Sequence, residues 1–304
     1  MNDTLMNETL MNDPCADLLF QDSLAPAATV AQPPGSNRLQ IDSTLQYAVD
    51  GLAEFVFLIH AVTDVGQTLV HESLQIEPPT PFRTYCDDQS GNRFLRFQAQ
   101  PGPLKLVYRA LVDRLIEPAD LNAPEVPVHD IPDDVLHYLT PTRYCESDHL
   151  GPNAAQLFGQ LPRGYARVQA ICDWVRGNIE YRIGSTNATT TAREVFMQRA
   201  GVCRDFAHLS VTFCRALNIP ARLVSGYATF EEPPPDFHAV FEAYLGGRWV
   251  MFDPTAMSPL DQIVRLAHGR DAKDVAFATI FGPAHMVAMS PDVVLVNHNP
   301  VPTM

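Results

Sequence analysis

The fold is decided by the stretch Arg199-Ala-Gly-Val-Cys-Arg-Asp-Phe-Ala-His208, which places a cysteine where a helix begins. Apolar residues recur after it at spacings of three and four, which predicts a helix over residues 204–217 that Asn218 and Pro220 end. The first N–H groups of a helix lack internal partners, and with the helix dipole they favour an anion. Cys203 therefore lies where a thiolate, the nucleophilic form of cysteine, is stabilised.

Cys203 is accordingly the candidate nucleophile. Its own backbone N–H can point at the oxyanion that develops when a carbonyl is attacked, and Gly201 lets the backbone approach closely. The alternative is that Cys203 is only a buried small hydrophobic residue, as many free cysteines are. We apply that second interpretation to Cys172 and Cys214, which fall in mid-helix on apolar faces.

A hairpin further along the chain supplies the partners. Gly246-Gly247 is typical of a two-residue turn between strands 238–245 and 248–255, and it sets Leu245 opposite Arg248. In this register Asp253 lies diagonal to His238 on one face, at the roughly 7–8 Å that side chains can bridge. Such an aspartate fixes the imidazole tautomer and leaves the other ring nitrogen for a cysteine. The alternatives are that His238 is a solvent-exposed histidine at the start of a strand, and that Asp253 is only the turn residue of Asp253-Pro254.

The order of elements predicts an α+β fold. A helix over residues 165–179 precedes the cysteine helix, and strands over 221–230, 238–245 and 248–255 follow it. Alternating segments at 39–47 and 104–112, a short apolar run at 55–62 and a segment at 91–99 that follows a turn signal favour a β-sandwich-like domain. We expect a disordered tail (1–37), this β-rich domain (38–118), a proline-rich linker (119–132), a catalytic domain (133–290) and a C-terminal tail (291–304).

Composition narrows the class of protein. The net charge of −14 over 304 residues disfavours nucleic acid as a partner. No apolar run reaches the roughly 18 residues of a membrane span, and no secretory signal is visible, so we expect no membrane partner and a cytoplasmic location. The six cysteines show no CxxC pair and are expected to be mostly reduced.

Metal binding is the weaker alternative for the cysteines. Two loose clusters, His137 with Cys145 and His149, and Cys203 with His208 and Cys214, do not have the spacing of a compact zinc site. We therefore expect no metal and no cofactor.

Four segments in order resemble bacterial transglutaminase-like proteins, many of which are labelled cysteine proteases. They are Gly201–Leu209, Leu217–Tyr227, Phe237-His-Ala and Gly247–Thr255. The resemblance continues through Gly269–Val275 and covers roughly residues 38–290, with a β-rich region ahead of the core. It implies a transglutaminase/papain-like core with the cysteine helix packed on an antiparallel sheet. Arg204, where many relatives have Gln, and Val240, where Trp often follows His-Ala, depart from the family pattern.

The resemblance implies that Cys203 is the nucleophile, His238 the base and Asp253 its orienting partner. The expected reaction is acyl transfer from an amide bond of a protein or peptide through a thioester, with hydrolysis favoured over transamidation. A non-catalytic binding module is the remaining alternative. For the second oxyanion donor Tyr181, Gln198 and Trp249 all carry suitable groups, and we choose Tyr181 because it lies between the first helix and the cysteine segment. The oligomeric state stays open.

Overall fold

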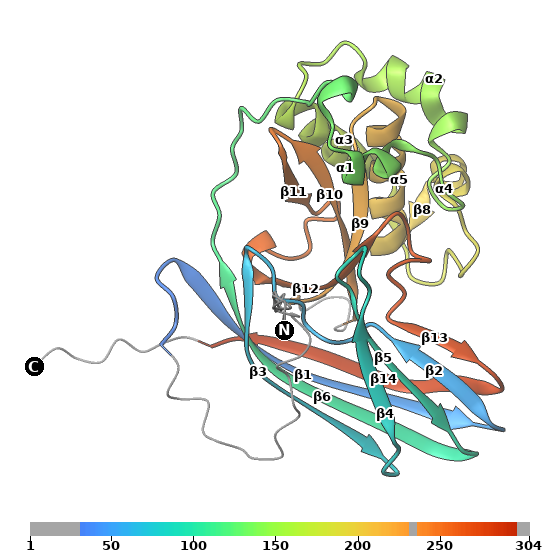
Figure 1. Ribbon diagram of the computed structural model, residues 1–304. Helices are drawn as coiled ribbons and strands as arrows, with labels where there is room; N and C mark the ends of the chain where they lie inside the picture. The colour runs from blue at the N-terminus through green and yellow to red at the C-terminus, as the bar shows by residue number, and fades with distance from the viewer. Residues whose placement is uncertain (1–30, 231–235, 297–304) are drawn as a thin grey trace, which may run out of the picture.

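The computed structural model describes residues 31–230 and 236–296. Its helices lie at one end, a β-sandwich lies at the other, and a four-stranded sheet lies between them with β12 nearest the sandwich (Figure 1). Residues 1–30 of the tail predicted over residues 1–37 lie outside the described part of the chain. Strand β1 begins at Ser36, within the predicted tail. In the described part of the chain no helix has the length and apolar character to cross a membrane.

The β-sandwich consists of two antiparallel four-stranded sheets. One has the order β14-β1-β6-β3 and the other β13-β2-β5-β4. The strands are β1 (Ser36–Val49), β2 (Ala53–Phe57), β3 (Gln67–Glu77), β4 (Phe82–Cys86), β5 (Arg93–Ala99), β6 (Gly102–Leu115), β13 (Ala278–Phe281) and β14 (Ala284–Leu295).

Alternating side chains of the two sheets form the core of the sandwich. Phe55 stacks on Phe57 with 5.6 Å between ring centroids and on Phe97 with 5.4 Å, and Tyr47 meets Phe55 edge-on. Aromatic pairs at these separations stabilise a core beyond the area they bury. Each of the four predicted segments overlaps a strand, although β2 ends at Phe57 within the segment predicted over residues 55–62, whereas β3, β4, β13 and β14 were not predicted.

The last two strands correct the predicted domain boundaries. The boundary at residue 290 falls inside β14, which pairs with β1 from Leu39↔Leu295 to Val49↔Ala284. The predicted tail over 291–304 therefore begins within a strand, and the described end of the chain belongs to the sandwich. The pairing joins residues more than 230 positions apart in the chain, so no local sequence pattern indicates it.

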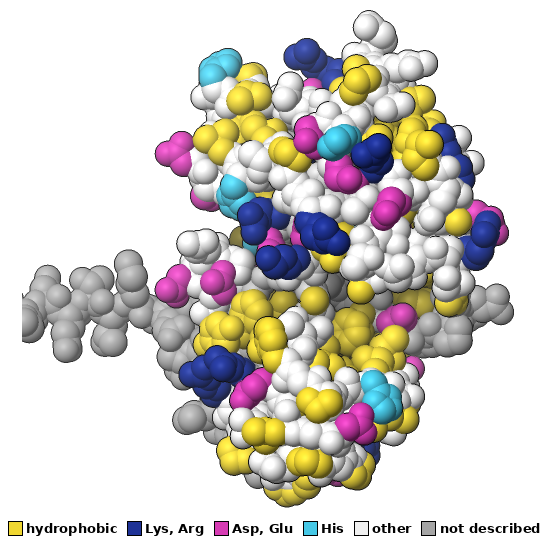
Figure 2. Space-filling model, turned by 90° about the vertical axis from the view of Figure 1, so that its right-hand side faces the viewer, with side chains coloured by type: hydrophobic (Ala, Val, Ile, Leu, Met, Phe, Trp, Pro, Cys, Tyr) yellow, Lys and Arg dark blue, Asp and Glu magenta, His cyan; other side chains and the backbone are white. Residues whose placement is uncertain are grey.

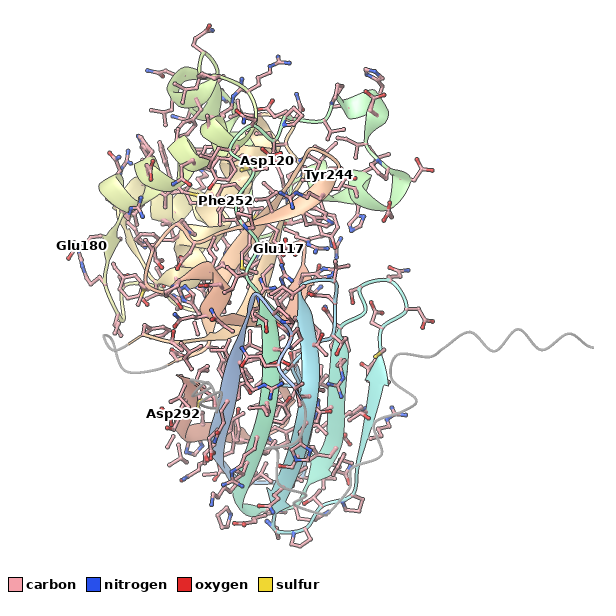
Figure 3. The ribbon with its side chains drawn as sticks, turned by 90° about the vertical axis from the view of Figure 1, so that its left-hand side faces the viewer. Glu117, Asp120, Glu180, Tyr244, Phe252 and Asp292 are labelled. Atoms are coloured by element: carbon pink, nitrogen blue, oxygen red, sulfur yellow. The ribbon has the colours of Figure 1, made fainter. Side chains whose placement is uncertain are left out.

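The predicted linker is held against the core. It runs from β6 past the hairpin, and Glu117 and Asp120 mark its path in Figure 3. The short helix η2 (Val128–Asp130) lies within it, and the short helices α1 (Asp133–Leu136) and η3 (His137–Leu139) follow it. The carbonyls of Ala123 and Pro124 accept hydrogen bonds from Tyr165 and Gly246, so the segment fixes the position of the core.

The core packs helices on the sheet β11-β10-β9-β12. The helices are α2 (Ser147–Phe158), α3 (Tyr165–Asn178), α4 (Ala192–Gln198) and α5 (Cys203–Ala216), and the sheet strands are β9 (Ala221–Ala228), β10 (His238–Leu245), β11 (Arg248–Phe252) and β12 (Ile263–Gly269). A short parallel pair, β7 (Glu180–Tyr181) and β8 (Ala200–Gly201), lies ahead of α5. The α+β class is confirmed, and α2 and α4 were not predicted.

Helix α5 is the centre of this packing. Phe213 meets Phe158, Trp174 and Phe196 from the three surrounding helices, with 5.2–6.0 Å between ring centroids. Its other apolar residues share a cluster with Leu223, Phe241 and Phe252 of the sheet. Close packing on all sides restrains both the position of the helix and its rotation about its own axis. The location of its first residue is therefore fixed.

Gly226 in β9 gives a direct test of the close strand packing beside His238. It pairs with His238 of β10 and Arg265 of β12, and an added Cβ would lie 2.6 Å from the Val264 carbonyl oxygen. We predict that Gly226→Ala lowers the free energy of unfolding by about 1–3 kcal/mol, the typical cost of overpacking. Urea unfolding monitored by circular dichroism measures this.

Gly177 in α3 is the matched control, because a Cβ there meets no atom within 4 Å. Gly177→Ala should raise the free energy of unfolding by up to about 1 kcal/mol. Equal effects at the two positions would contradict the packing described for β9.

Candidate active site

Cys203 is the first residue of α5, within one residue of the predicted helix start. The chain enters through extended Val202, and Phe206 N–H closes the first turn on the Val202 carbonyl at 3.1 Å. The side chain of Cys203 is partly exposed, whereas the other free thiols, Cys145, Cys172 and Cys214, are buried. Burial raises the pKa of all three, and that of Cys145 reaches about 11. Among the free cysteines of residues 31–230 and 236–296, Cys203 is thus the accessible one.

Asp205 fixes the backbone on which Cys203 stands. Its carboxylate is fully buried, and Oδ2 accepts hydrogen bonds from Val202 N–H at 3.0 Å and from Thr186 Oγ1 at 2.6 Å. A Cβ on Gly201 would lie 2.7 Å from the Asp205 Cβ, so glycine is required there. An acidic residue in the first turn of a helix is favoured by the helix dipole, and the structure adds this network.

Arg204 balances the buried charge of Asp205. Its guanidinium donates to Oδ1 at 2.7 and 3.1 Å, and Nη2 also donates to the Asn187 carbonyl at 2.9 Å. The pair therefore ties the loop after Tyr181 to the first turn of α5. The polar run Ser185–Thr191 in the sequence predicts only a loop, so this link could not be found without its long-range partner.

Tyr181 lies beside the cysteine. Tyr181 in β7 pairs with Gly201 in β8, two residues before Cys203. Burial, followed by the charge of Cys203, raises the pKa of the Tyr181 hydroxyl, and a hydrogen bond from the Cys203 N–H opposes that rise. The Tyr181 hydroxyl thus lies near Cys203, and it keeps its proton at neutral pH.

The two other candidates for this position lie elsewhere. Gln198 Nε2 donates to the Ala200 carbonyl at 2.9 Å. Trp249 packs edge-on against Tyr138 and Tyr244 and beneath the Arg222 guanidinium. These contacts do not place the Gln198 amide or the Trp249 indole against Cys203.

The hairpin adopts the predicted register. Gly246 and Gly247 both have left-handed backbone angles, φ +58° and +82°, as a two-residue turn requires. Pairing runs from Leu245↔Arg248 to Phe241↔Phe252. His238 is the first residue of β10, and Asp253 follows the last residue of β11. His238 Nε2 lies 3.0 Å from Asp253 Oδ2.

Asp253 is held by donors besides the histidine. Oδ1 accepts from Thr255 N–H at 2.9 Å and from Thr255 Oγ1 at 2.6 Å, and Oδ2 accepts from Met257 N–H at 3.2 Å. Burial alone would raise the pKa of the carboxyl, but the hydrogen bond and charge of His238 and the Thr255 donors lower it overall. The carboxylate is therefore charged and rigidly oriented.

His238 is protonated over a wide pH range. Burial favours the neutral ring, but the hydrogen bond to Asp253 and the charges of Cys203 and Asp253 outweigh it and raise the pKa to about 10. A raised histidine pKa stabilises the fold below the ordinary value of 6.5 and loses that contribution as pH rises towards 10, whereas the lowered Asp253 pKa loses its contribution in acid. The ion pair thus persists through neutral pH.

The second ring nitrogen of His238 is available. Nδ1 is buried and makes no hydrogen bond in this structure, while Cys203 Sγ lies 4.0 Å from the Phe237 carbonyl oxygen. Hydrogen bonds in an active site are often long before substrate binds. The structure brings Cys203, His238, Asp253 and Tyr181 together.

Other residues singled out in the sequence have structural roles. His208 is buried, its Nε2 accepts from Ala272 N–H, and burial lowers its pKa to about 3. A glutamate on a strand is commonly an exposed charge, but Glu242 is buried between Arg222 and Arg265. Within residues 31–230 and 236–296, no group of three or more His, Cys, Asp or Glu side chains is arranged to hold a metal ion.

Comparison with known proteins covers both parts of the chain. Residues 153–254 match the transglutaminase-like superfamily, and residues 37–134 match the bacterial transglutaminase N-terminal domain. A crystal structure from Cytophaga hutchinsonii, described as a "putative cysteine protease", is 40% identical, with a TM-score of 0.82 over 88% of this chain and 94% of that one.

Curated relatives match over a shorter segment. An uncharacterized protein of Mycobacterium leprae is 35% identical over 120 residues, which cover 36% of this chain and 42% of that protein. An uncharacterized protein of Mycobacterium tuberculosis is 36% identical over 109 residues, 31% of this chain and 35% of that one. The matched segment thus spans about two fifths of these relatives or less. The family models and the Cytophaga hutchinsonii structure together lead to one conclusion: this chain belongs to the transglutaminase-like superfamily, with a bacterial transglutaminase N-terminal domain ahead of its core.

Proposed function

We propose that this protein is a cysteine enzyme that cleaves amide bonds of proteins or peptides by acyl transfer through Cys203. The observation that carries the proposal is His238, which bonds Asp253 through Nε2 and leaves the buried Nδ1 for the thiol. A nucleophile, a base and a group that orients the base are the parts that covalent catalysis requires.

In the proposed resting state the proton of the Cys203 thiol is already on His238 Nδ1, which gives a thiolate and an imidazolium that Asp253 stabilises. The thiolate attacks the amide carbon, and the oxyanion accepts hydrogen bonds from the Cys203 N–H and the Tyr181 hydroxyl. Collapse of this intermediate breaks the C–N bond, and the amine leaves with the proton of His238. A thioester remains on Cys203.

Water completes the proposed reaction. His238 takes a proton from water, the hydroxide oxygen attacks the thioester, and the acid leaves as Cys203 regains its thiolate. An amine in place of water would give transamidation from the same thioester. We favour hydrolysis because water reaches any site that admits an amine.

Alkylation with iodoacetamide tests the thiolate–imidazole pair without a known substrate. Iodoacetamide should modify Cys203 at pH 6.5 far faster than Cys145, Cys172 and Cys214, which are buried internal controls. His238→Gln should lower the Cys203 rate at pH 6.5 by about 10-fold or more, because the thiolate loses its counter-charge. The two proteins should converge near pH 10, where the wild-type imidazolium loses its proton. Peptide mass spectrometry measures each rate.

Two outcomes would count against the enzyme. If Cys203 reacts no faster than Cys145, Cys172 and Cys214, the chain is better described as a transglutaminase-like binding module. If His238→Gln changes the rate equally at every pH, the imidazole does not activate the thiol.

The role of Tyr181 is tested by a second reagent. p-Nitrophenyl acetate acylates a thiol through a tetrahedral oxyanion, whereas iodoacetamide reacts by displacement of iodide and forms none. Tyr181→Phe should lower the acylation rate by about 10-fold or more and leave alkylation within about twofold of wild type. Thr186→Val, which removes the hydroxyl bound to Asp205, should lower acylation about threefold or more by loosening the Tyr181 loop.

Combining the two changes shows whether Thr186 acts through Tyr181. The double variant should acylate no more slowly than Tyr181→Phe alone, since residues that act as one unit are not additive. Thr84→Val, at an exposed position of β4, is the control and should change neither rate. Multiplicative effects, or alkylation rates that fall in parallel with acylation, would contradict the assignment of Tyr181.

A further inference from the structure

A second site lies at the seam between the β-sandwich and the core. There a cavity of about 680 Å³ opens between the turn of residues 87–92, the η3 segment and the loop after β12. Its volume is that of small-molecule pockets, which often form between domains. Figure 2 shows Lys and Arg side chains gathered over the hollow between the two parts, although the chain as a whole is acidic. Cys203 does not line this cavity.

The walls of the seam cavity are preformed. The Asn92 side chain is buried and makes two hydrogen bonds with the backbone of His268, donating to its carbonyl at 2.9 Å and accepting from its N–H at 3.0 Å. These bonds join the sandwich turn to the end of β12. Val56, Leu58 and Phe94 supply an apolar surface on the sandwich side.

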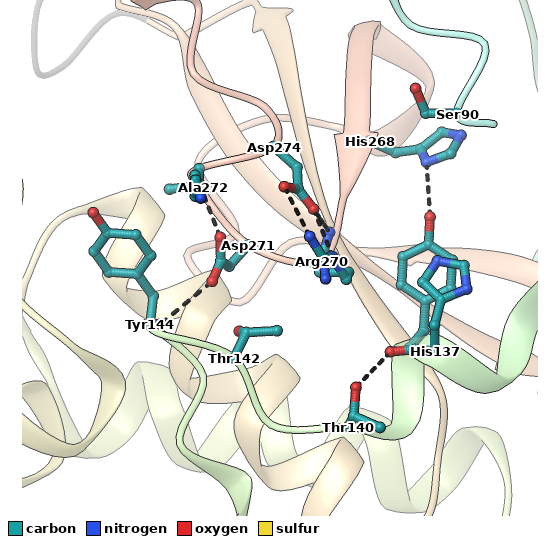
Figure 4. Close-up of polar contacts among 12 residues, drawn as sticks. Ser90, His137, Thr140, Thr142, Tyr144, His268, Arg270, Asp271, Ala272 and Asp274 are labelled. Atoms are coloured by element: carbon teal, nitrogen blue, oxygen red, sulfur yellow. Dashed lines mark hydrogen bonds and ion pairs between the residues drawn. The ribbon is translucent and has the colours of Figure 1, made fainter. Parts of the chain in front are cut away.

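The tautomer of His268 follows from its neighbours (Figure 4). Burial, followed by the charge of Arg222, lowers its pKa to about 4, so the ring is neutral and carries one N–H. Arg222 Nη1 lies 3.2 Å from Nε2, and because arginine only donates, Nε2 is the acceptor. The proton is therefore on Nδ1, which lies 3.4 Å from the Tyr138 hydroxyl oxygen and donates to it.

The hydroxyl proton of Tyr138 then has no acceptor among the described residues. Tyr138 is only 7% exposed and lines the cavity. Both neighbours of its oxygen, His268 and Arg222, are donors, and burial raises its pKa, so the O–H stays protonated. A buried donor without an acceptor is costly, and a ligand oxygen in the cavity would satisfy it.

The charges around the cavity favour an anionic oxygen. Asp274 is engaged by Arg270 through the backbone N–H and Nε, both at 3.0 Å. Asp87 is engaged within its own turn by the N–H and hydroxyl of Ser90. Lys273 also lines the cavity, and its ammonium forms no ion pair with any described residue. A carboxylate beside Lys273 and Tyr138 would pair with the lysine ammonium and accept a hydrogen bond from the tyrosine hydroxyl.

We infer that the seam cavity binds a carboxylate on a short apolar stem, with Lys273 pairing its charge and the Tyr138 hydroxyl donating to one of its oxygens. The stem lies against the apolar surface of the sandwich. Two sources have this chemistry, a free organic acid and the acidic side chain of a peptide. The site is separate from the proposed reaction at Cys203 and does not depend on it.

Isothermal titration calorimetry of the full chain with two probes tests the site and separates the sources. The probes are sodium glutarate and the blocked peptide Ac-Ala-Ala-Glu-Ala-Ala-NH2, and uncharged glutaramide is the ligand control. At least one acid should bind and glutaramide should not. Binding of glutarate alone identifies a free acid as the ligand, and binding of the peptide identifies an acidic side chain. Cys203→Ser should bind as wild type does.

Substitutions assign the two contacts. Lys273→Gln and Tyr138→Phe should each weaken binding by about 10-fold or more, because each removes a hydrogen bond to a charged group. Lys105→Gln changes the only other lysine of the chain, an exposed residue of β6, and should leave binding unchanged. Thermal unfolding of each variant checks its fold. The inference is overturned if neither acid binds, if glutaramide binds equally well, or if Lys273→Gln and Lys105→Gln have the same effect.

Discussion

The buried ion pair between His238 and Asp253 is the interaction on which the rest of the site depends. Two charges removed from water cost several kcal/mol each unless geometry and further hydrogen bonds offset that cost. Here the carboxylate accepts from His238, from both donors of Thr255 and from the Met257 N–H. This arrangement keeps the imidazole protonated and oriented, so that Nδ1 is left for Cys203.

The fold brings the thiol to that imidazole through two rigid elements. Helix α5 is buried on all sides, and its first residue is held by Asp205, whose carboxylate binds both the entering backbone and the loop after Tyr181. The hairpin of β10 and β11 holds the histidine and the aspartate in register. Sites built on helices and strands hold the geometry that covalent catalysis needs more closely than sites on loops do.

Local sequence patterns predicted the parts of the site whose geometry is local. The two glycines of the turn set the hairpin register, so the proximity of His238 and Asp253 could be derived. The apolar spacing of α5 placed Cys203 at a helix start to within one residue. Three features escaped prediction because their partners are distant in the chain: β14 pairs with β1, Asp205 with Thr186, and Glu242 with Arg265. An isolated glutamate on a strand looks exposed until the arginines of the neighbouring strands are placed beside it.

Cys203 and Asp253 together hold His238 as an imidazolium at neutral pH. Nitrogen-15 NMR of the labelled imidazole rings, recorded from pH 5 to pH 11 on wild type and Cys203→Ser, measures this directly. The His238 nitrogens of the wild type should stay protonated until about pH 10, and the His238 ring of the variant should lose its proton at lower pH. A His238 ring that titrates near pH 6.5 in both proteins would contradict it.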